Sequence, residues 1–188
     1  MIQVAFLDTN IILDYLENRN QEVRDILAQL LLLQKKGRIV LATSVFNIAE
    51  LIDNEFQIHF IAWCLKERMS YDEVISKINR DERLFNEISN KNKREIERRI
   101  RDFIFKKGIK IFSLEGGEEY NEIYNLIYER NLRSQDALIV ATALKNRVTY
   151  FLSNDSNLLS RISDLVYVYN LRDDNMLESF RRDVLEAI

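Results

Sequence analysis

Short apolar runs rich in residues that favour extended backbone recur along the chain and predict strands. They cover residues 2–7 (IQVAFL), 38–42 (RIVLA), 109–113 (IKIFS), 148–153 (VTYFLS) and 165–169 (LVYVY). The longer segments between them mix apolar with charged residues, as helices that bury one face do. The pattern therefore predicts strands that alternate with helices.

Helices are predicted where apolar positions recur with helical spacing between capping residues. The predicted helices cover residues 10–20, 21–37, 44–56, 70–108 with interruptions, 116–131 and 134–147. Ser44 and Ser134 are suitable N-caps, and Gly37 is in a C-cap position. Ser70 and Glu73 have the spacing of a capping box.

The order of these elements predicts an α/β fold. Alternating strands and helices favour a central parallel sheet, here of about four to five strands, between two helical layers. Functional sites in such sheets lie beyond the carboxyl ends of the strands. Residues 55–108 contain no strand candidate. We expect a single domain over residues 1–188 with a helical insertion at about 55–108.

Composition narrows the chemistry. The chain is 47% hydrophobic and 30% charged, as in a globular protein, and no apolar run reaches the roughly 18–20 residues that span a bilayer. We therefore expect a cytoplasmic protein without membrane contact. Cys64 and His59 are the only residues of their types, which argues against disulfides, thiolate clusters and multi-histidine zinc sites. Both lie in an apolar stretch and are expected to pack in the core.

Acidic residues occur where the predicted fold would place a site. Asp8 and Asp155 each follow a strand, Asp136 lies in a first helical turn, and Glu50 lies further along a helix that begins beside a strand end. Each alone is explained by capping, turns or the helix dipole. If all four share one cleft, their mutual repulsion favours a bound divalent cation. Oxygen ligands without histidine or cysteine suit Mg²⁺ or Mn²⁺ and phosphoryl chemistry.

Motifs containing these acids carry a family resemblance. In chain order they are FLDTNIILDYLE, SVFNIAEL, SQDALIVATALK and YFLSND. Together they resemble the PIN-domain family of metal-dependent ribonucleases, which includes the VapC-like toxins of prokaryotic toxin–antitoxin pairs. The resemblance covers roughly residues 2–54 and 109–170, and its most specific element is the run at residues 136–143.

This resemblance implies a site and a function. Asp8, Glu50, Asp136 and Asp155 would form the acidic quartet, catalytic and metal-binding at once, in an Mg²⁺- or Mn²⁺-dependent endoribonuclease. RNA would be the substrate, and an antitoxin protein and a homodimer are open as partners. Thr9, Asn10, Ser153 and Asn154 would form a supporting shell around the acids. Where many members carry a further acid and an aromatic residue, this chain has Asn157 and Leu158.

A basic segment stands out within the predicted insertion. Residues 90–108 carry eight Lys or Arg residues against three acids. Arg94, Arg98 and Arg101 share one helical face and are candidates for binding RNA phosphates, with a solvated surface as the alternative. Ile96, Ile100, Phe103 and Ile104 should face inward. The eight tyrosines should lie mainly in the core rather than stack on bases. The helix expected at residues 116–131 has apolar residues at Tyr120, Ile123, Tyr124 and Ile127.

Two other functions compete with the nuclease. A catalytically inactive PIN-like module could bind RNA or a protein and would need no carboxylate-bound metal. A haloacid-dehalogenase-type phosphatase would use Asp8 as a nucleophile, but that chemistry generally needs a second acid two residues later, where this chain has Asn10. Metal titration separates the first from a nuclease, and trapping of an aspartyl-phosphate would reveal the second.

Overall fold

A parallel sheet of five strands forms the centre of the computed structural model, which describes residues 2–79, 89–115, 117 and 119–187. The strand order is β3-β2-β1-β4-β5, and every neighbouring pair is parallel. The strands are β1 (Gln3–Leu7), β2 (Ile39–Ser44), β3 (Lys110–Phe112), β4 (Tyr150–Ser153) and β5 (Tyr167–Asn170). All five predicted strands are confirmed, with ends shifted by up to two residues.

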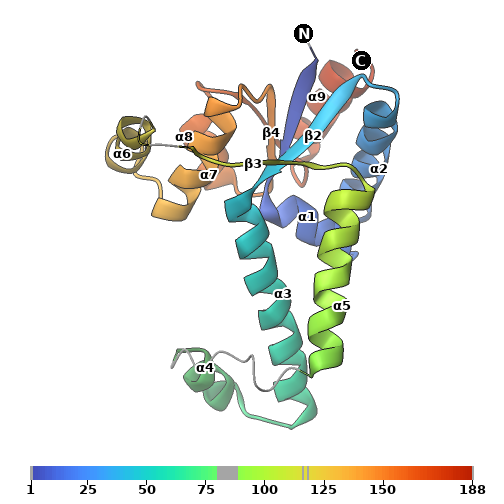
Figure 1. Cartoon of the computed structure of the whole chain (residues 1–188), viewed down its shortest axis with the longest axis vertical. Helices are drawn as coiled ribbons and strands as arrows, with labels where there is room; N and C mark the ends of the chain where they lie inside the picture. The colour runs from blue at the N-terminus through green and yellow to red at the C-terminus, as the bar shows by residue number, and fades with distance from the viewer. Residues whose placement is uncertain (1, 80–88, 116, 118, 188) are drawn as a thin grey trace.

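Helices cover both faces of this sheet (Figure 1). Their bounds are α1 (Thr9–Leu16), α2 (Gln21–Lys35), α3 (Val45–Lys66), α4 (Tyr71–Asn79), α5 (Asn90–Arg101), α6 (Tyr120–Tyr128), α7 (Ser134–Lys145), α8 (Ser156–Ile162) and α9 (Asp174–Phe180), with π-helical turns η1 (Asp102–Lys106) and η2 (Arg181–Leu185). The predicted three-layer α/β/α architecture is confirmed. None of these helices is long and apolar enough to cross a membrane, within the residues described.

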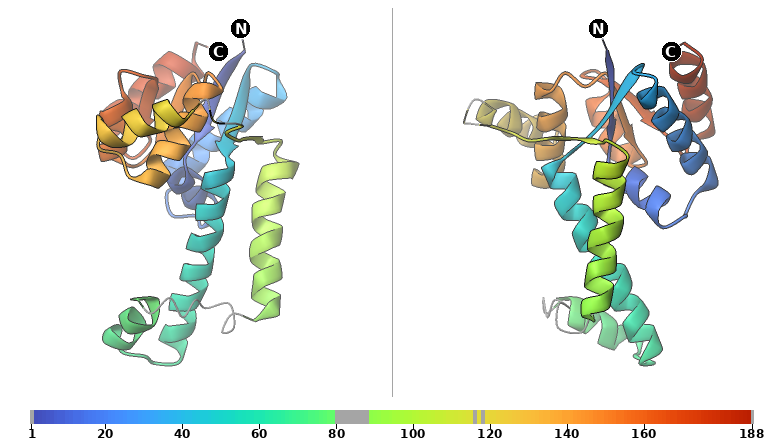
Figure 2. Two further views of the ribbon diagram at one scale, coloured as in Figure 1. Left: turned by 60° about the vertical axis from the view of Figure 1, so that its left-hand side comes forward. Right: turned by 45° about the vertical axis from the view of Figure 1, so that its right-hand side comes forward.

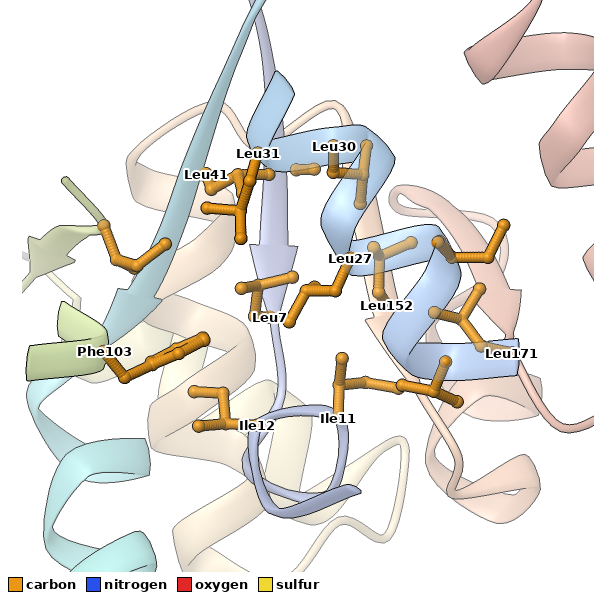
Figure 3. Close-up of a cluster of buried hydrophobic side chains, with 14 of the residues drawn as sticks. Leu7, Ile11, Ile12, Leu27, Leu30, Leu31, Leu41, Phe103, Leu152 and Leu171 are labelled. Carbon is orange, nitrogen blue, oxygen red and sulfur yellow. The ribbon is translucent and has the colours of Figure 1, made fainter. Parts of the chain in front are cut away.

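Alternating residues of the strands pack in two separate hydrophobic cores, one on each face of the sheet. Ala5 and Leu7 of β1 face a cluster with α1, α2, α9 and the inner side of α5, shown in Figure 3. Phe6, between them, faces the opposite cluster with α7 and α8 and stacks on Phe151 of β4. This two-sided burial explains why the strand sequences are apolar at successive positions.

The long helix α3 and helix α5 leave the body side by side, with α4 near their far end (Figures 1 and 2). Residue 55, the expected start of an insertion, lies inside the continuous helix α3. Residues 80–88 of that segment lie outside the described part of the chain. A single domain with a helical insertion over about 55–108 therefore stays a proposal.

Capping residues fix where the central elements begin. Ser44 and Asn47 form a capping box at the start of α3, so the predicted N-cap is confirmed. The Ser70–Glu73 box is also present. The prediction for Ser134 is wrong by one position: Arg133 is the N-cap, no side chain caps α7, and Ser134 is its first helical residue.

Candidate active site

Asp8 follows β1 and is the N-cap of α1. Its Oδ1 accepts hydrogen bonds from the backbone N–H of Thr9 (2.8 Å) and from Nδ2 of Asn47 (2.9 Å). Its Oδ2 accepts from Nδ2 of Asn10 (2.9 Å) and from Oγ of Ser153 (2.6 Å). β1 pairs with β4, which brings Ser153 beside Asp8. The Asp8 carboxylate is thus held by four donors from three elements.

The electrostatic setting of Asp8 is unusual. The side chain is buried, at 6% exposure, and burial is the main cause that raises its pKa to about 6. Hydrogen bonds from Ser153 and Thr9 lower the pKa, whereas the charges of Glu50 and Asp136 raise it further. Among the described residues, no Lys or Arg forms an ion pair with Asp8. A buried carboxylate in this position is short of positive charge.

Glu50 is connected to Asp8 through Thr9 and Asn47. Thr9 Oγ1 donates to Glu50 Oε2 over 2.6 Å and accepts from Asn47 Nδ2 over 3.1 Å. Asn47 Nδ2 therefore lies between Asp8 and Thr9 and donates to both. This short chain of hydrogen bonds fixes the orientation of Glu50 relative to Asp8.

Asp136 and Asp155 lie on the α7 and α8 side of the sheet. Asp136 is in the first turn of α7; burial and then the charge of Asp155 raise its pKa, while Arg133 and Arg161 lower it. Asp155 is the N-cap of α8, and its Oδ1 accepts from the backbone N–H groups of Asn157 (2.9 Å) and Leu158 (3.0 Å). Its backbone N–H donates to Ser153 Oγ over 3.0 Å, which connects it to Asp8.

The four acids are electrostatically coupled, but they are not drawn into one tight cluster. The charges of Glu50 and Asp136 raise the pKa of Asp8, and the charge of Asp155 raises the pKa of Asp136. Over the described residues, no three His, Cys, Asp or Glu side chains already form a cation site. The assignment of the quartet as metal ligands stays a prediction. The donor set still fits a divalent cation, because it consists of oxygen atoms and includes a buried carboxylate without a cationic partner.

Comparisons with known proteins identify the family. A model of the PIN domain matches residues 65–165, which is more than half of the chain. The chain belongs to the PIN-domain family. The match contains Asp136 and Asp155 and begins after Asp8 and Glu50. Membership in this family supports the assignment of the protein as a nuclease.

A solved structure shows the same fold as this PIN domain. It is the crystal structure of VapBC2 from Rickettsia felis bound to a DNA fragment from their promoter. The similarity covers 89% of this chain and 98% of that chain, with a TM-score of 0.55 and 19% sequence identity. At this identity the likeness is evidence for the fold alone. No curated protein matches the sequence.

Three of the four predicted shell residues contact the acids of this PIN domain directly. Thr9 donates to Glu50, and Asn10 and Ser153 both donate to Asp8. Asn154 is connected to the acids indirectly, because its backbone N–H donates to Asn10 Oδ1 over 2.9 Å. The assignment of functional roles to these residues remains a prediction.

Asn47 is a residue of the site that the sequence did not reveal. It is fully buried and donates to Asp8 and to Thr9 while it closes the Ser44 capping box. The available signal was a polar residue three positions after an N-cap, within an otherwise apolar stretch. That signal indicates a helix start, so a second role toward Asp8 could not be read from it.

The three arginines that are candidates for binding RNA phosphates lie on α5. Arg94, Arg98 and Arg101 are exposed, and Arg101 is 3.8 Å from Glu97. The intervening Arg99 turns inward, where it contacts Glu17, the Leu16 carbonyl and the buried Glu55. The expected apolar face is confirmed, since the side chains of four residues are buried: Ile96, Ile100, Phe103 and Ile104.

The expectation that the tyrosines lie mainly in the core is wrong, because Tyr71, Tyr167 and all three tyrosines of α6 are exposed. Tyr120, Tyr124 and Tyr128 are 69%, 50% and 75% exposed and stack on one another along the helix. Leu126 is the buried residue of this helix instead. Spacing of three and four residues predicts a common face, but it cannot tell whether that face points to the core or to solvent.

Proposed function

We propose that this PIN domain is a metal-dependent endoribonuclease that hydrolyses RNA phosphodiester bonds. Asp8, Glu50, Asp136 and Asp155 would hold one or two Mg²⁺ or Mn²⁺ ions. The observation that carries the proposal is Asp8, a buried carboxylate with a raised pKa, four hydrogen-bond donors and no cationic partner among the described residues. Such a group is stabilised by a bound cation.

The residues around the acids would have distinct roles. Asn10, Asn47 and Ser153 fix both oxygens of Asp8 and thereby hold its carboxylate group in one orientation. Thr9 orients Glu50 in the same way. The metal, when bound, would lower the pKa of a water molecule and offset charge on the phosphodiester. The protein side chains would bind and orient the metal and the phosphodiester.

The decisive experiment is RNA cleavage by the purified protein with Mn²⁺ or Mg²⁺ and by Asp136→Asn. We expect cleavage by the native protein and a loss of at least about 100-fold in the variant, since a charged ligand is replaced by an amide of the same shape. Glu119→Gln is a matched control, because Glu119 is a buried acid paired with Lys145 away from the quartet. Full activity of Asp136→Asn would refute the assignment.

The alternative of an inactive binding module is favoured by one observation: no three described acids, cysteines or histidines form a ready cation site. Metal titration separates the two functions. For a nuclease, Mn²⁺ should raise the melting temperature of the native protein, and the gain should shrink in an Asp8→Asn, Asp155→Asn double variant. For an inactive module, Mn²⁺ would leave both melting temperatures unchanged. A phosphatase remains disfavoured because Asn10 has no acidic proton to transfer.

We also propose partners for three surfaces on the helices. The basic face of α5, with Arg94, Arg98 and Arg101, would bind RNA phosphates. An apolar groove of about 420 Å³ lies between α3 and α5, lined by residues such as Ile52, Phe56 and Phe105. The structural neighbour is a VapBC complex, and by analogy an antitoxin segment would pack in this groove and make this protein a toxin. A second copy of the chain is proposed at α6.

A further inference from the structure

A buried ion pair lies behind the candidate active site. Asp14 of α1 is almost completely buried, with 2% of its side chain exposed. Arg172, which follows β5, binds it in a bidentate manner: Nη2 to Oδ1 over 2.6 Å and Nε to Oδ2 over 3.0 Å. The Arg172 side chain is half exposed. The charge of Asp14 is therefore neutralised within the pair and is not available to a metal at the acidic quartet.

Asp14 has a third hydrogen bond, and it leads to the site. Asn154 Nδ2 donates to Asp14 Oδ2 over 2.8 Å. The other atom of that amide, Oδ1, is buried and has no partner among the described residues. Within the described part of the chain, Asp14 is thus the one hydrogen-bond partner of the Asn154 side chain.

Helix α1 accepts a second hydrogen bond from Asn154. Asn10 and Asp14 are four residues apart on α1 and share one face. Asn10 Oδ1 accepts the backbone N–H of Asn154, and Asp14 accepts its side-chain N–H. Asn10 then donates to Asp8 and to Ser153 through Nδ2. The amide of Asn10 therefore has one allowed direction, since its oxygen and its nitrogen both have fixed partners.

Asn154 occupies the turn between β4 and α8. It stands between Ser153, which donates to Asp8, and Asp155, which is the N-cap of α8. A change in the Asn154 backbone would move both neighbours. We infer that Asp14, held by Arg172, is a positioning residue that locks this turn and thereby the relative placement of Asp8 and Asp155. The inference rests on the proposed function for its effect on catalysis, but the lock itself does not.

The variant that tests the lock is Asp14→Asn. An amide at this position keeps the shape, but its nitrogen would oppose a donor of Arg172 or Asn154, so the three hydrogen bonds cannot all persist. We expect faster hydrogen exchange at the backbone amides of Asn154 and Asp155, measured by NMR or mass spectrometry. We also expect a loss of about 10- to 100-fold in kcat and in Mn²⁺ affinity, with a much smaller change in the KM for RNA. Arg172→Met should show the same losses, and Arg172→Lys, which keeps the charge but not the bidentate contact, should fall between Arg172→Met and the native protein.

The control is Glu119→Gln, which removes a buried acid from the Glu119–Lys145 ion pair at the other end of α7. It should destabilise the protein without altering exchange at Asn154 or the kcat. Unchanged exchange at Asn154 and Asp155 in folded Asp14→Asn would overturn the inference. So would a loss of kcat in Glu119→Gln equal to that in Asp14→Asn. If the native protein neither cleaves RNA nor binds Mn²⁺, the proposed function fails, and the exchange measurement still decides the lock.

Discussion

The Asp8 carboxylate is rich in hydrogen-bond donors and short of positive charge. Four donors hold it, yet burial and the neighbouring acids raise its pKa to about 6. Hydrogen bonds favour the ionised form, so the raised pKa means that desolvation outweighs all of them. A side chain in this balance responds to either a proton or a cation.

This balance predicts a pH-dependent stability. The folded pKa of Asp8 lies near 6 and its ordinary value is 3.8, so the folded protein binds the proton more tightly. Stability without metal should therefore fall as the pH rises from about 4 to above 6, by up to about 3 kcal/mol for this group. Asp136 and Glu55, whose pKa values are also raised, add to the trend.

Urea unfolding at pH 4.5 and pH 7.5 measures this effect when the native protein is compared with Asp8→Asn. The variant lacks the titrating group, so its stability should change less between the two pH values. The same experiment with saturating Mn²⁺ should remove most of the difference at pH 7.5, because the cation replaces the proton. An equal pH dependence in both proteins without metal would show that Asp8 titrates normally.

At the scale of elements, the sequence predicts the strands and where they end, but it does not predict the hydrogen-bond partners of individual side chains. Asp8 and Asp155 follow apolar runs, and parallel topology places such ends along one edge. Asn47 and Asp14 each act through contacts with residues distant in the chain, Asp8 and Arg172 respectively. Local spacing gives no indication of those contacts, so the roles of these two residues could not be predicted from the sequence.

Helix α5 shows the same limit and supports a prediction. Its arginines alternate between two roles, because Arg99 is engaged by Glu17 and Glu55 while Arg94 and Arg98 are exposed. Changing Arg94, Arg98 and Arg101 to Gln should weaken RNA binding and flatten the slope of log affinity against log salt by about 2 units. The affinity for Mn²⁺ and the cleavage rate at saturating RNA should change little.

Binding of a single-stranded RNA at several salt concentrations measures the slope. Lys35→Gln with Lys36→Gln provides the control. Lys35 ends α2 and Lys36 is its C-cap, so both precede the amino end of β2, whereas the acids lie beyond the carboxyl ends of the strands. This double variant should leave the slope nearly unchanged. A slope that is the same for the triple variant and the native protein would assign the α5 arginines to another partner or to solvent.

At the scale of the whole molecule, the sheet separates three surfaces with different chemistry. Asp8 and Asp155 follow β1 and β4, and arginines lie on the projecting helix α5. Tyrosines line α6, a helix across the sheet from α1 and α2 (Figure 2). Under the proposed function, one RNA strand would contact both the acidic site and the basic helix. The tyrosine face needs a different explanation, because it is an exposed aromatic stripe on a separate helix.

The explanation we propose is a second copy of the chain. A twofold axis would pair the tyrosine face with itself, and aromatic side chains are enriched in the buried centres of such interfaces. We expect the native protein to be a dimer by size-exclusion chromatography with light scattering, and the variant with Tyr120, Tyr124 and Tyr128 changed to Ser to be a monomer. Changing the exposed Tyr71 and Tyr167 to Ser should leave the dimer intact, because these residues lie on other elements. A native monomer at tens of micromolar, or a triple variant that still dimerises, would contradict this assignment of α6.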